Sequence, residues 1–193
     1  MSEQKIIFSR KEQQKIKPVI EDFIIEHFDG ELKQTVLDFV SYLRANDMSV
    51  KWVSLNGWDA GYKKEKICHI NLPLGTGTLN EHIWFISPIL NHINDYEELI
   101  KSEKLQNFIW DNIFYCVHDP KSPYAGRNCS PKKGCAGGIN TAALGKEIKG
   151  KCGHRPHLHI FNPGETALAK IKRLLELETE ERNNLKFARV NNV

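Results

Sequence analysis

The chain has 193 residues, with 27 Lys and Arg against 24 Asp and Glu, and 40 % of its residues are apolar. These values favour a globular protein with a hydrophobic core and exclude a wholly disordered chain. No apolar run reaches the roughly 18–20 residues that span a bilayer, and residues 1–17 contain no apolar stretch of signal-peptide length. We therefore expect a cytoplasmic protein without a membrane segment.

Helical signals dominate the first part of the chain. Ser9 and Glu12 form a capping box, in which the Ser side chain accepts from the helix start and the Glu side chain reaches back. The helical spacing of apolar residues continues through 19–24. A second helix is predicted over 32–43, where apolar residues form one stripe, and Asn46 and Asp47 are suited to end it.

The pattern then changes to short runs rich in Val, Ile, Trp, Phe and Tyr, separated by turn signals such as Asn56-Gly57. Such runs predict an antiparallel meander. The predicted strands cover residues 51–56, 58–63, 66–72 and 82–87. Several of them have apolar residues on both faces, as Trp84 and Phe85 illustrate, so we expect helices to cover part of the sheet.

Two more elements follow before the end of the chain. Asp95 and Glu98 give a second capping signal ahead of an amphipathic face over 105–113. Residues 157–161 have the pattern of one further strand. Helices at both ends of a run of strands are typical of the α+β class.

A last helix is expected to begin at Asn162, which is a good N-cap residue, with Pro163 at the first helical position. After residue 178 the chain is polar. The sequence thus predicts a single α+β domain over residues 1–178, with an antiparallel sheet of about five strands packed by helices, and a polar tail over 179–193.

Four of the five cysteines fall between residues 116 and 152, together with several histidines. A disulfide framework is not expected, because cytosolic thiols are kept reduced. Thiolates and imidazoles are the usual ligands of a structural zinc ion, and zinc would order a Pro- and Gly-rich loop that has no core of its own. We predict a zinc-binding loop over residues 116–154. The expected ligands are Cys116, Cys129, Cys135 and Cys152, with His118 or His154 as substitutes.

A different ligand set is available in the histidines. His157 and His159 alternate along the predicted strand and so project from one face. With Cys152 or His154 they offer three zinc ligands and an open position for water, the arrangement of a zinc-dependent hydrolase. No carboxylate stands where a general base is obvious, so the structural zinc is the preferred hypothesis and the hydrolase is the alternative.

Residues 116–159 also carry the positive charge of the chain. They contain eight basic and two acidic residues, a net charge of +6, while the rest of the chain sums to −3. A basic segment can bind nucleic acid, but Tyr124 is the one aromatic interleaved among these charges. Counter-charges around a zinc–thiolate centre explain the same pattern, so nucleic-acid binding is the third hypothesis.

Four aromatic residues of the predicted strands, Trp52, Trp58, Tyr62 and Trp84, are candidates for lining a pocket. Aromatic residues in strands usually pack in the core, but some can line a cavity between helix and sheet that accepts an apolar or planar ligand. Cys68 has apolar neighbours and is expected to be buried, because nothing beside it supplies the base that a nucleophile needs.

Residues 144–148, Leu-Gly-Lys-Glu-Ile, are followed by Cys152 and by the helix start at Asn162. This order resembles the C-terminal part of uncharacterised bacterial cytosolic proteins, in which a cysteine-bearing loop precedes Gly-Lys-Glu and a further Cys. The resemblance covers about the last third of the chain and implies a metal-binding loop on an α+β domain, without an activity. The sequence therefore predicts a zinc-binding sensor or binding module whose partner is a small molecule or another protein.

Overall fold

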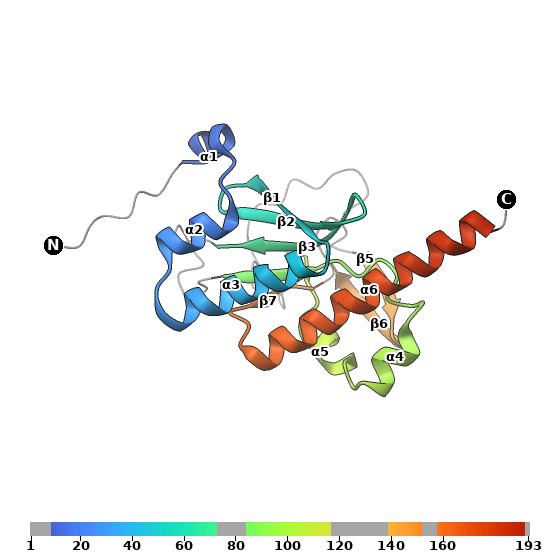
Figure 1. The fold of residues 1–193 in the computed structure, drawn as a ribbon. Helices are drawn as coiled ribbons and strands as arrows, with labels where there is room; N and C mark the ends of the chain where they lie inside the picture. The colour runs from blue at the N-terminus through green and yellow to red at the C-terminus, as the bar shows by residue number, and fades with distance from the viewer. Residues whose placement is uncertain (1–8, 73–83, 117–138, 152–157, 192–193) are drawn as a thin grey trace. The chain divides into compact units, whose positions relative to one another are not determined.

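The computed structural model describes residues 9–72, 84–116, 139–151 and 158–191, and at positions 139, 141, 143 and 185–191 it describes the backbone alone (Figure 1). Within these ranges the chain forms helices, a five-stranded antiparallel sheet in the order β1-β2-β3-β4-β7, and a separate ladder of β5 and β6. The predicted α+β class is confirmed. No described helix is both long enough and apolar enough to cross a membrane.

The chain begins with α1 (Arg10–Ile16), α2 (Ile20–His27) and α3 (Gly30–Ala45). The predicted capping box is present at α1, where the Ser9 hydroxyl accepts from the Glu12 N–H and the Glu12 carboxylate accepts from the Ser9 N–H. The sequence pattern predicts one helix through residue 24, whereas the structure separates α1 from α2. Lys17 at the break has φ 47° and precedes Pro18, which disfavours the helical conformation in the residue before it.

The predicted strands are present, each shifted by no more than a few residues. They are β1 (Ser49–Ser54), β2 (Gly57–Tyr62), β3 (Glu65–Asn71), β4 (Phe85–Pro88) and β7 (Ile160–Phe161). Buried Gln13 of α1 holds the turn between β1 and β2. Its side-chain oxygen accepts from the Asn56 N–H at 2.8 Å and from the Trp52 indole N–H at 3.1 Å.

Contacts within the chain define two compact units. Unit 1 comprises residues 1–86 and 161–168, and unit 2 comprises residues 87–160 and 169–193. The boundary between them falls inside β4, β7 and the last helix. The sequence predicts that residues 1–178 fold as a single domain, and this stays a prediction.

The core of unit 1 lies between its helices and its strands. Helices α2 and α3 pack against each other and against β1 (Figure 1). The ring of Phe23 in α2 lies 4.9 Å from Trp58, and the ring of Phe39 in α3 lies 6.4 Å from Trp84, between centroids. Both indoles are 1 % exposed. Aromatic side chains of this size supply much of the apolar area that stabilises a small core.

Unit 2 contains α4 (Glu97–Ser102), α5 (Gln106–Asp111), a hairpin of β5 (Ile139–Ala143) and β6 (Lys146–Lys151), and most of α6 (Glu165–Asn191). The hairpin corrects the sequence analysis, which predicts a loop without regular structure throughout 116–154. Its turn residues Leu144 and Gly145 have φ of 55° and 73°. A hairpin turn with two positive φ values usually contains Asn-Gly or Asp-Gly, so Leu144 conceals this turn in the sequence.

The last helix differs from its prediction at both ends. Asn162 does not cap it, because the Asn162 N–H donates to the Trp84 carbonyl at 2.9 Å and the Asn162 side chain accepts from the Trp84 N–H at 3.1 Å. Helix α6 begins three residues later, at Glu165. It also continues beyond residue 178 to Asn191, so the predicted polar tail is helical as far as that residue.

Candidate functional site

Cys116, the first of the predicted zinc ligands, lies beside β6. This strand ends one residue before Cys152, the last of the predicted cysteine ligands. The Cys116 N–H donates to the Gly150 carbonyl at 2.9 Å, and Tyr115 forms an antiparallel bridge with Lys151 of β6. The Cys116 side chain is 1 % exposed, and its thiol forms no disulfide with any described residue. Cys152 follows Lys151 directly in the sequence. We call this contact of residues 115–116 with residues 150–151 the Cys116 junction.

The other predicted zinc ligands, Cys129, Cys135, Cys152, His118, His154 and His157, lie outside the described residues. Among the residues that are described, no three His, Cys, Asp or Glu side chains form a group that could hold a metal ion. The ligand set therefore stays a prediction. Of its four cysteines, Cys116 is the one that lies within the described residues.

His159, the second member of the alternative metal set, is held from several sides in unit 2. Its Nδ1 lies 3.1 Å from the Ser87 hydroxyl oxygen, and its ring centroid lies 5.0 Å from that of Phe114. Its backbone N–H donates to the Asn112 carbonyl at 2.8 Å. These contacts fix the orientation of the imidazole.

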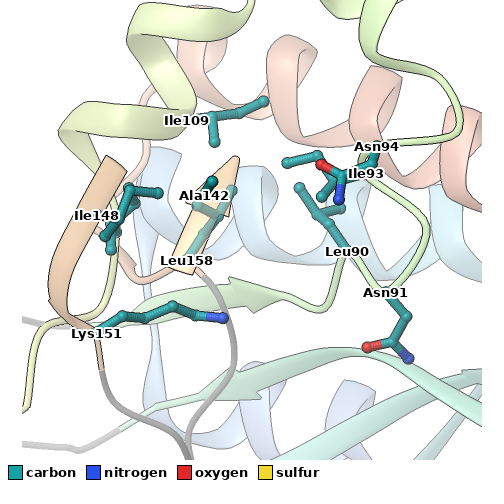
Figure 2. A pocket seen from close by; sticks show the side chains of 10 residues that line it. Leu90, Asn91, Ile93, Asn94, Ile109, Ala142, Ile148, Lys151 and Leu158 are labelled. Atoms are coloured by element: carbon teal, nitrogen blue, oxygen red, sulfur yellow. The ribbon is translucent and has the colours of Figure 1, made fainter. Parts of the chain in front are cut away.

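A pocket of about 150 Å³ lies within unit 2, next to the Cys116 junction (Figure 2). Its aliphatic wall is formed by Leu90, Ile93, Ile109, Ile113, Ile148 and Leu158. Its polar lining comes from Asn91, Asn94 and Lys151, and no acidic side chain is among the lining residues. An apolar cavity with a few polar groups at defined places is the usual form of a small-molecule site.

Lys151 connects the pocket to the Cys116 junction. Its residue is 9 % exposed, and Figure 2 shows its side chain extending from β6 beneath Leu158, toward the side of the pocket where Asn91 lies. The backbone of Lys151 forms the bridge to Tyr115, and its side chain lines the pocket.

A buried carboxylate supports the turn that carries Asn91. Glu178 of α6 is fully buried and accepts hydrogen bonds from the backbone N–H groups of Asn91 and His92, both at 3.2 Å. It also accepts from the Tyr96 hydroxyl at 2.8 Å and from Arg182 Nε at 3.0 Å. This arrangement fixes the turn that contributes Asn91 and its neighbours to the pocket.

The four aromatic residues predicted as a pocket do not line this one. Trp58 and Trp84 are core residues of unit 1, and the Trp58 indole N–H donates to the Pro18 carbonyl at 2.9 Å. Trp52 donates to Gln13, and Tyr62 lies under the ammonium of Lys63. Cys68 is fully buried, as predicted.

The structure also assembles a charged group in unit 1 that the sequence analysis missed. Asp59 and His69 lie directly opposite each other in β2 and β3, and Asp59 Oδ1 is 2.6 Å from His69 Nδ1 and 2.8 Å from Lys66 Nζ. Burial alone would raise the pKa of Asp59, but hydrogen bonds from His69 and Lys66 outweigh it and hold this pKa below its usual value. Asp59 and His69 each alternate with apolar neighbours, so the sequence indicates that each lies on the polar face of its strand. The sequence does not give the register of the two strands, which is what brings the two side chains together.

No protein-family model, curated protein or solved structure matches this chain. A functional assignment therefore depends on the chemistry of the residues themselves.

Proposed function

We propose that this chain is a zinc-binding module in which Cys116, Cys129, Cys135 and Cys152 hold a structural zinc ion, and that the unit 2 pocket binds a small molecule. The observation that carries the proposal is the Cys116 junction. It brings the start of the cysteine-bearing segment onto the strand that immediately precedes Cys152.

Chain topology supports this ligand set. Residues 116 and 152 enclose the other two cysteines, so a tetrahedral site made of all four thiolates would close the segment on itself. A cation at this position would stabilise the Cys116 thiolate, which burial alone disfavours. Basic residues of the segment would offset the net negative charge of a zinc–thiolate centre.

The position of the pocket supports a binding role. Ile113 lies just before the first cysteine of the segment, and Ile148 and Lys151 lie just before its last cysteine, Cys152; all three line the pocket. An ion that orders the segment would also order these walls. Zinc would then act as a structural support for ligand binding, which is the behaviour of a sensor or binding module.

The proposal is tested by zinc content in two matched cysteine variants. Cys116→Ser removes a proposed ligand, whereas Cys68→Ser alters a buried thiol of β3 that lies in unit 1. We expect about one zinc ion per chain in the unmodified protein and in Cys68→Ser, and loss of most of the zinc in Cys116→Ser, by elemental mass spectrometry on protein purified under reducing conditions.

Two outcomes would overturn the proposal. A chain without zinc after purification in zinc-containing buffer would remove the metal altogether. A Cys116→Ser variant that keeps the full zinc content would remove Cys116 from the ligand set. Circular dichroism of both variants separates loss of a ligand from loss of the fold.

The zinc-dependent hydrolase is kept as a second candidate because of His159. Metal-binding histidines commonly have their second ring nitrogen hydrogen-bonded to a protein group, and Ser87 makes that kind of contact with His159 Nδ1. In this alternative His154, His157 and His159 hold a zinc ion that activates water. A His157→Ala, His159→Ala double variant that keeps its zinc would exclude this alternative and leave the cysteine site in place.

Nucleic-acid binding has less support among the described basic residues. The Lys146 ammonium lies over the Trp110 ring, 4.8 Å from its centroid, and Lys149 lies 3.5 Å from Glu147. Lys151 lines the pocket. Binding of this class weakens steeply with salt, so the absence of any mobility shift of a labelled oligonucleotide at low salt would exclude it.

A further inference from the structure

We infer that strands β1, β2 and β3 of unit 1 carry an ester-hydrolysing site, with Ser54 as the nucleophile and His69 as its general base. The inference goes beyond the proposed function and does not depend on the zinc site, because every residue that it uses belongs to unit 1. Its evidence is the pairing of His69 with a carboxylate, the side chains gathered around Gly57, and the aromatic residues beside them.

The contact between His69 and Asp59 sets the tautomer of the imidazole. His69 Nδ1 lies 2.6 Å from Asp59 Oδ1, and Lys66 Nζ lies 2.8 Å from the same oxygen. Burial would raise the pKa of Asp59, but these two donors outweigh it and hold the pKa below its usual value. The carboxylate is therefore ionised near neutral pH and accepts only, so Nδ1 carries the proton.

The other ring nitrogen of His69 is then a proton acceptor. A neutral imidazole that is protonated at Nδ1 has a lone pair at Nε2. Within the described part of the chain Nε2 forms no hydrogen bond, and the His69 side chain is 18 % exposed. A histidine oriented by a carboxylate and open at its second nitrogen has the arrangement of a general base.

Gly57 of β2 allows two more polar side chains to approach the His69 ring. A Cβ atom at Gly57 would lie 3.1 Å from both His69 Cε1 and Asn71 Nδ2, and closer still to Ser54 Oγ. Ser54 pairs with Gly57 across β1 and β2, and Gly57 pairs with Asn71 across β2 and β3. The three side chains therefore surround one point, with no side chain of β2 between them. The ring atom of His69 at this point, Cε1, is bonded directly to Nε2.

Ser54 and Asn71 supply the two groups that a histidine base needs for acyl transfer. Among the described residues the Ser54 hydroxyl has no hydrogen-bond partner, so its proton is available to His69, and hydrogen bonds of this kind often tighten only when substrate is bound. Asn71 Nδ2 donates to the Leu55 carbonyl at 3.4 Å. An amide NH2 group has a second N–H, which is suited to the negative charge that develops on a carbonyl oxygen during attack.

Aromatic residues beside His69 indicate the class of substrate. The Phe85 ring of β4 lies 6.1 Å from the His69 ring and 5.8 Å from the Phe161 ring of β7, between centroids. Phe161 is half-buried, as are Ser54 and His69, so a small molecule reaches all three from solvent. Aromatic surface of this kind packs against a planar group. The substrate class that we assign is a small carboxylic ester with an aromatic alcohol group.

The reaction needs water as its second reactant and no other. Ser54 Oγ attacks the ester carbonyl carbon while its proton passes to His69 Nε2. The bond between the carbonyl carbon and the alcohol oxygen breaks, and the alcohol leaves with that proton. Water then attacks the acyl group on Ser54 and gives a proton to Nε2, which returns it to Ser54 Oγ as the carboxylic acid leaves.

The test measures the release of p-nitrophenolate from p-nitrophenyl acetate by the full, zinc-loaded chain. General-base catalysis contributes roughly 10²- to 10⁴-fold, so we expect Ser54→Ala and His69→Gln each to lower kcat/KM at least roughly 100-fold. Ser49→Ala removes the other hydroxyl of β1, which donates to the Gly61 carbonyl at 3.3 Å, and should keep the activity of the unmodified chain.

Two further variants separate the base from other effects. His92→Gln alters a histidine of unit 2 that also lies beside a carboxylate, at 3.4 Å from Asp95, and should leave the activity unchanged. Asp59 acts through His69 and is a positioning residue. Asp59→Asn should lower kcat with little change in KM, because an amide does not hold the ring in the required tautomer; circular dichroism gives the folded fraction of each variant.

A covalent probe locates the nucleophile without a variant. Diisopropyl fluorophosphate forms a bond from phosphorus to a nucleophilic serine oxygen, with fluoride as the leaving group and the serine proton taken up by the base. We expect peptide mass spectrometry to find the adduct on Ser54. An adduct confined to other residues would overturn the assignment of Ser54.

The remaining outcomes overturn the inference at defined points. Release of p-nitrophenolate no faster than in the presence of His92→Gln, His69→Gln double-variant chain at the same concentration would remove the activity, and full activity in folded Ser54→Ala would remove the nucleophile. Loss of the activity in the His157→Ala, His159→Ala variant would assign it to the zinc-dependent hydrolase instead. Zinc content is measured on the same samples, so a chain without zinc that hydrolyses the ester would contradict the proposed function and leave this inference standing.

Discussion

The carboxylate of Asp59 receives hydrogen bonds from two side chains of the neighbouring strand. His69 and Lys66 of β3 both contact the same oxygen, Oδ1, and the Asp59 side chain is 23 % exposed. The hydrogen bonds exceed the effect of burial, so the pKa of Asp59 is below its usual value. A group with a lowered pKa in the folded state stabilises the fold above its unfolded-state pKa and loses this effect as the pH falls through the folded-state value.

Asp59→Asn is therefore expected to lower the free energy of unfolding by about 1–2 kcal/mol at pH 7, since it leaves partly buried donors without their charged acceptor. The difference from the unmodified chain should shrink below about pH 4, where the Asp59 carboxylate takes up a proton. Urea unfolding at several pH values measures it. Asp38→Asn, at an exposed position of α3 in the same unit, is the control. A difference that does not shrink below about pH 4 would contradict this account.

At the scale of elements, a buried ion pair within α6 is hydrogen-bonded to the segment that carries residues 91, 92 and 96 of unit 2. Glu178 and Arg182 are four residues apart on α6, with side-chain exposures of 0 % and 6 %. Glu178 also accepts from Tyr96 and from the backbone of residues 91 and 92. Burial, and then the charge of Glu178, raises the pKa of Tyr96 well above its ordinary value, so the Tyr96 hydroxyl remains a donor.

Glu178→Gln is expected to destabilise the protein by about 3–5 kcal/mol, because it leaves the buried Arg182 without a counter-charge. Glu176→Gln on the same helix, where the side chain is 40 % exposed, should cost less than about 1 kcal/mol. Replacing both members of the buried pair by Leu and Met should recover part of the loss. Thermal or urea unfolding compares the three variants, and equal stability of the two Gln variants would show that the buried pair has no special role.

Elements with strong local signals could be predicted from the sequence. Elements whose limits depend on an unusual turn conformation or on contacts with distant residues could not. Runs rich in β-branched and aromatic residues, separated by turn signals, predict β1, β2 and β3. The β5–β6 hairpin was missed because Leu144 adopts a turn conformation that its side chain disfavours. The start of α6 was misplaced because the Asn162 side chain binds Trp84, which is 78 residues away.

The candidate site was predictable only in part, for a similar reason. The clustering of cysteines around residues 116–152 is a property of the sequence and indicates a metal. The pocket is assembled from residues between 90 and 158 that no local pattern connects. Its charged member, Lys151, has the same local sequence signal as exposed Lys149 two positions earlier. Burial by elements distant in the sequence separates these two lysines.

At the scale of the whole molecule, the proposed function lies in unit 2. The pocket, the Cys116 junction and the buried pair of α6 are all formed by residues of that unit. Unit 1 has a separate aromatic core around Trp58 and Trp84. The metal binding and the ligand binding that we propose both belong to unit 2, and the inferred ester-hydrolysing site belongs to unit 1.

X-ray absorption spectroscopy at the zinc edge, on full-length protein purified under reducing conditions, tests the central claim most directly. Zinc–sulfur and zinc–nitrogen distances differ, at about 2.3 Å and about 2.0–2.1 Å. We expect a first shell dominated by sulfur at the longer distance, in keeping with Cys116 and its three partner cysteines. A shell dominated by nitrogen or oxygen at the shorter distance would favour the histidine site, and a protein without zinc would contradict both.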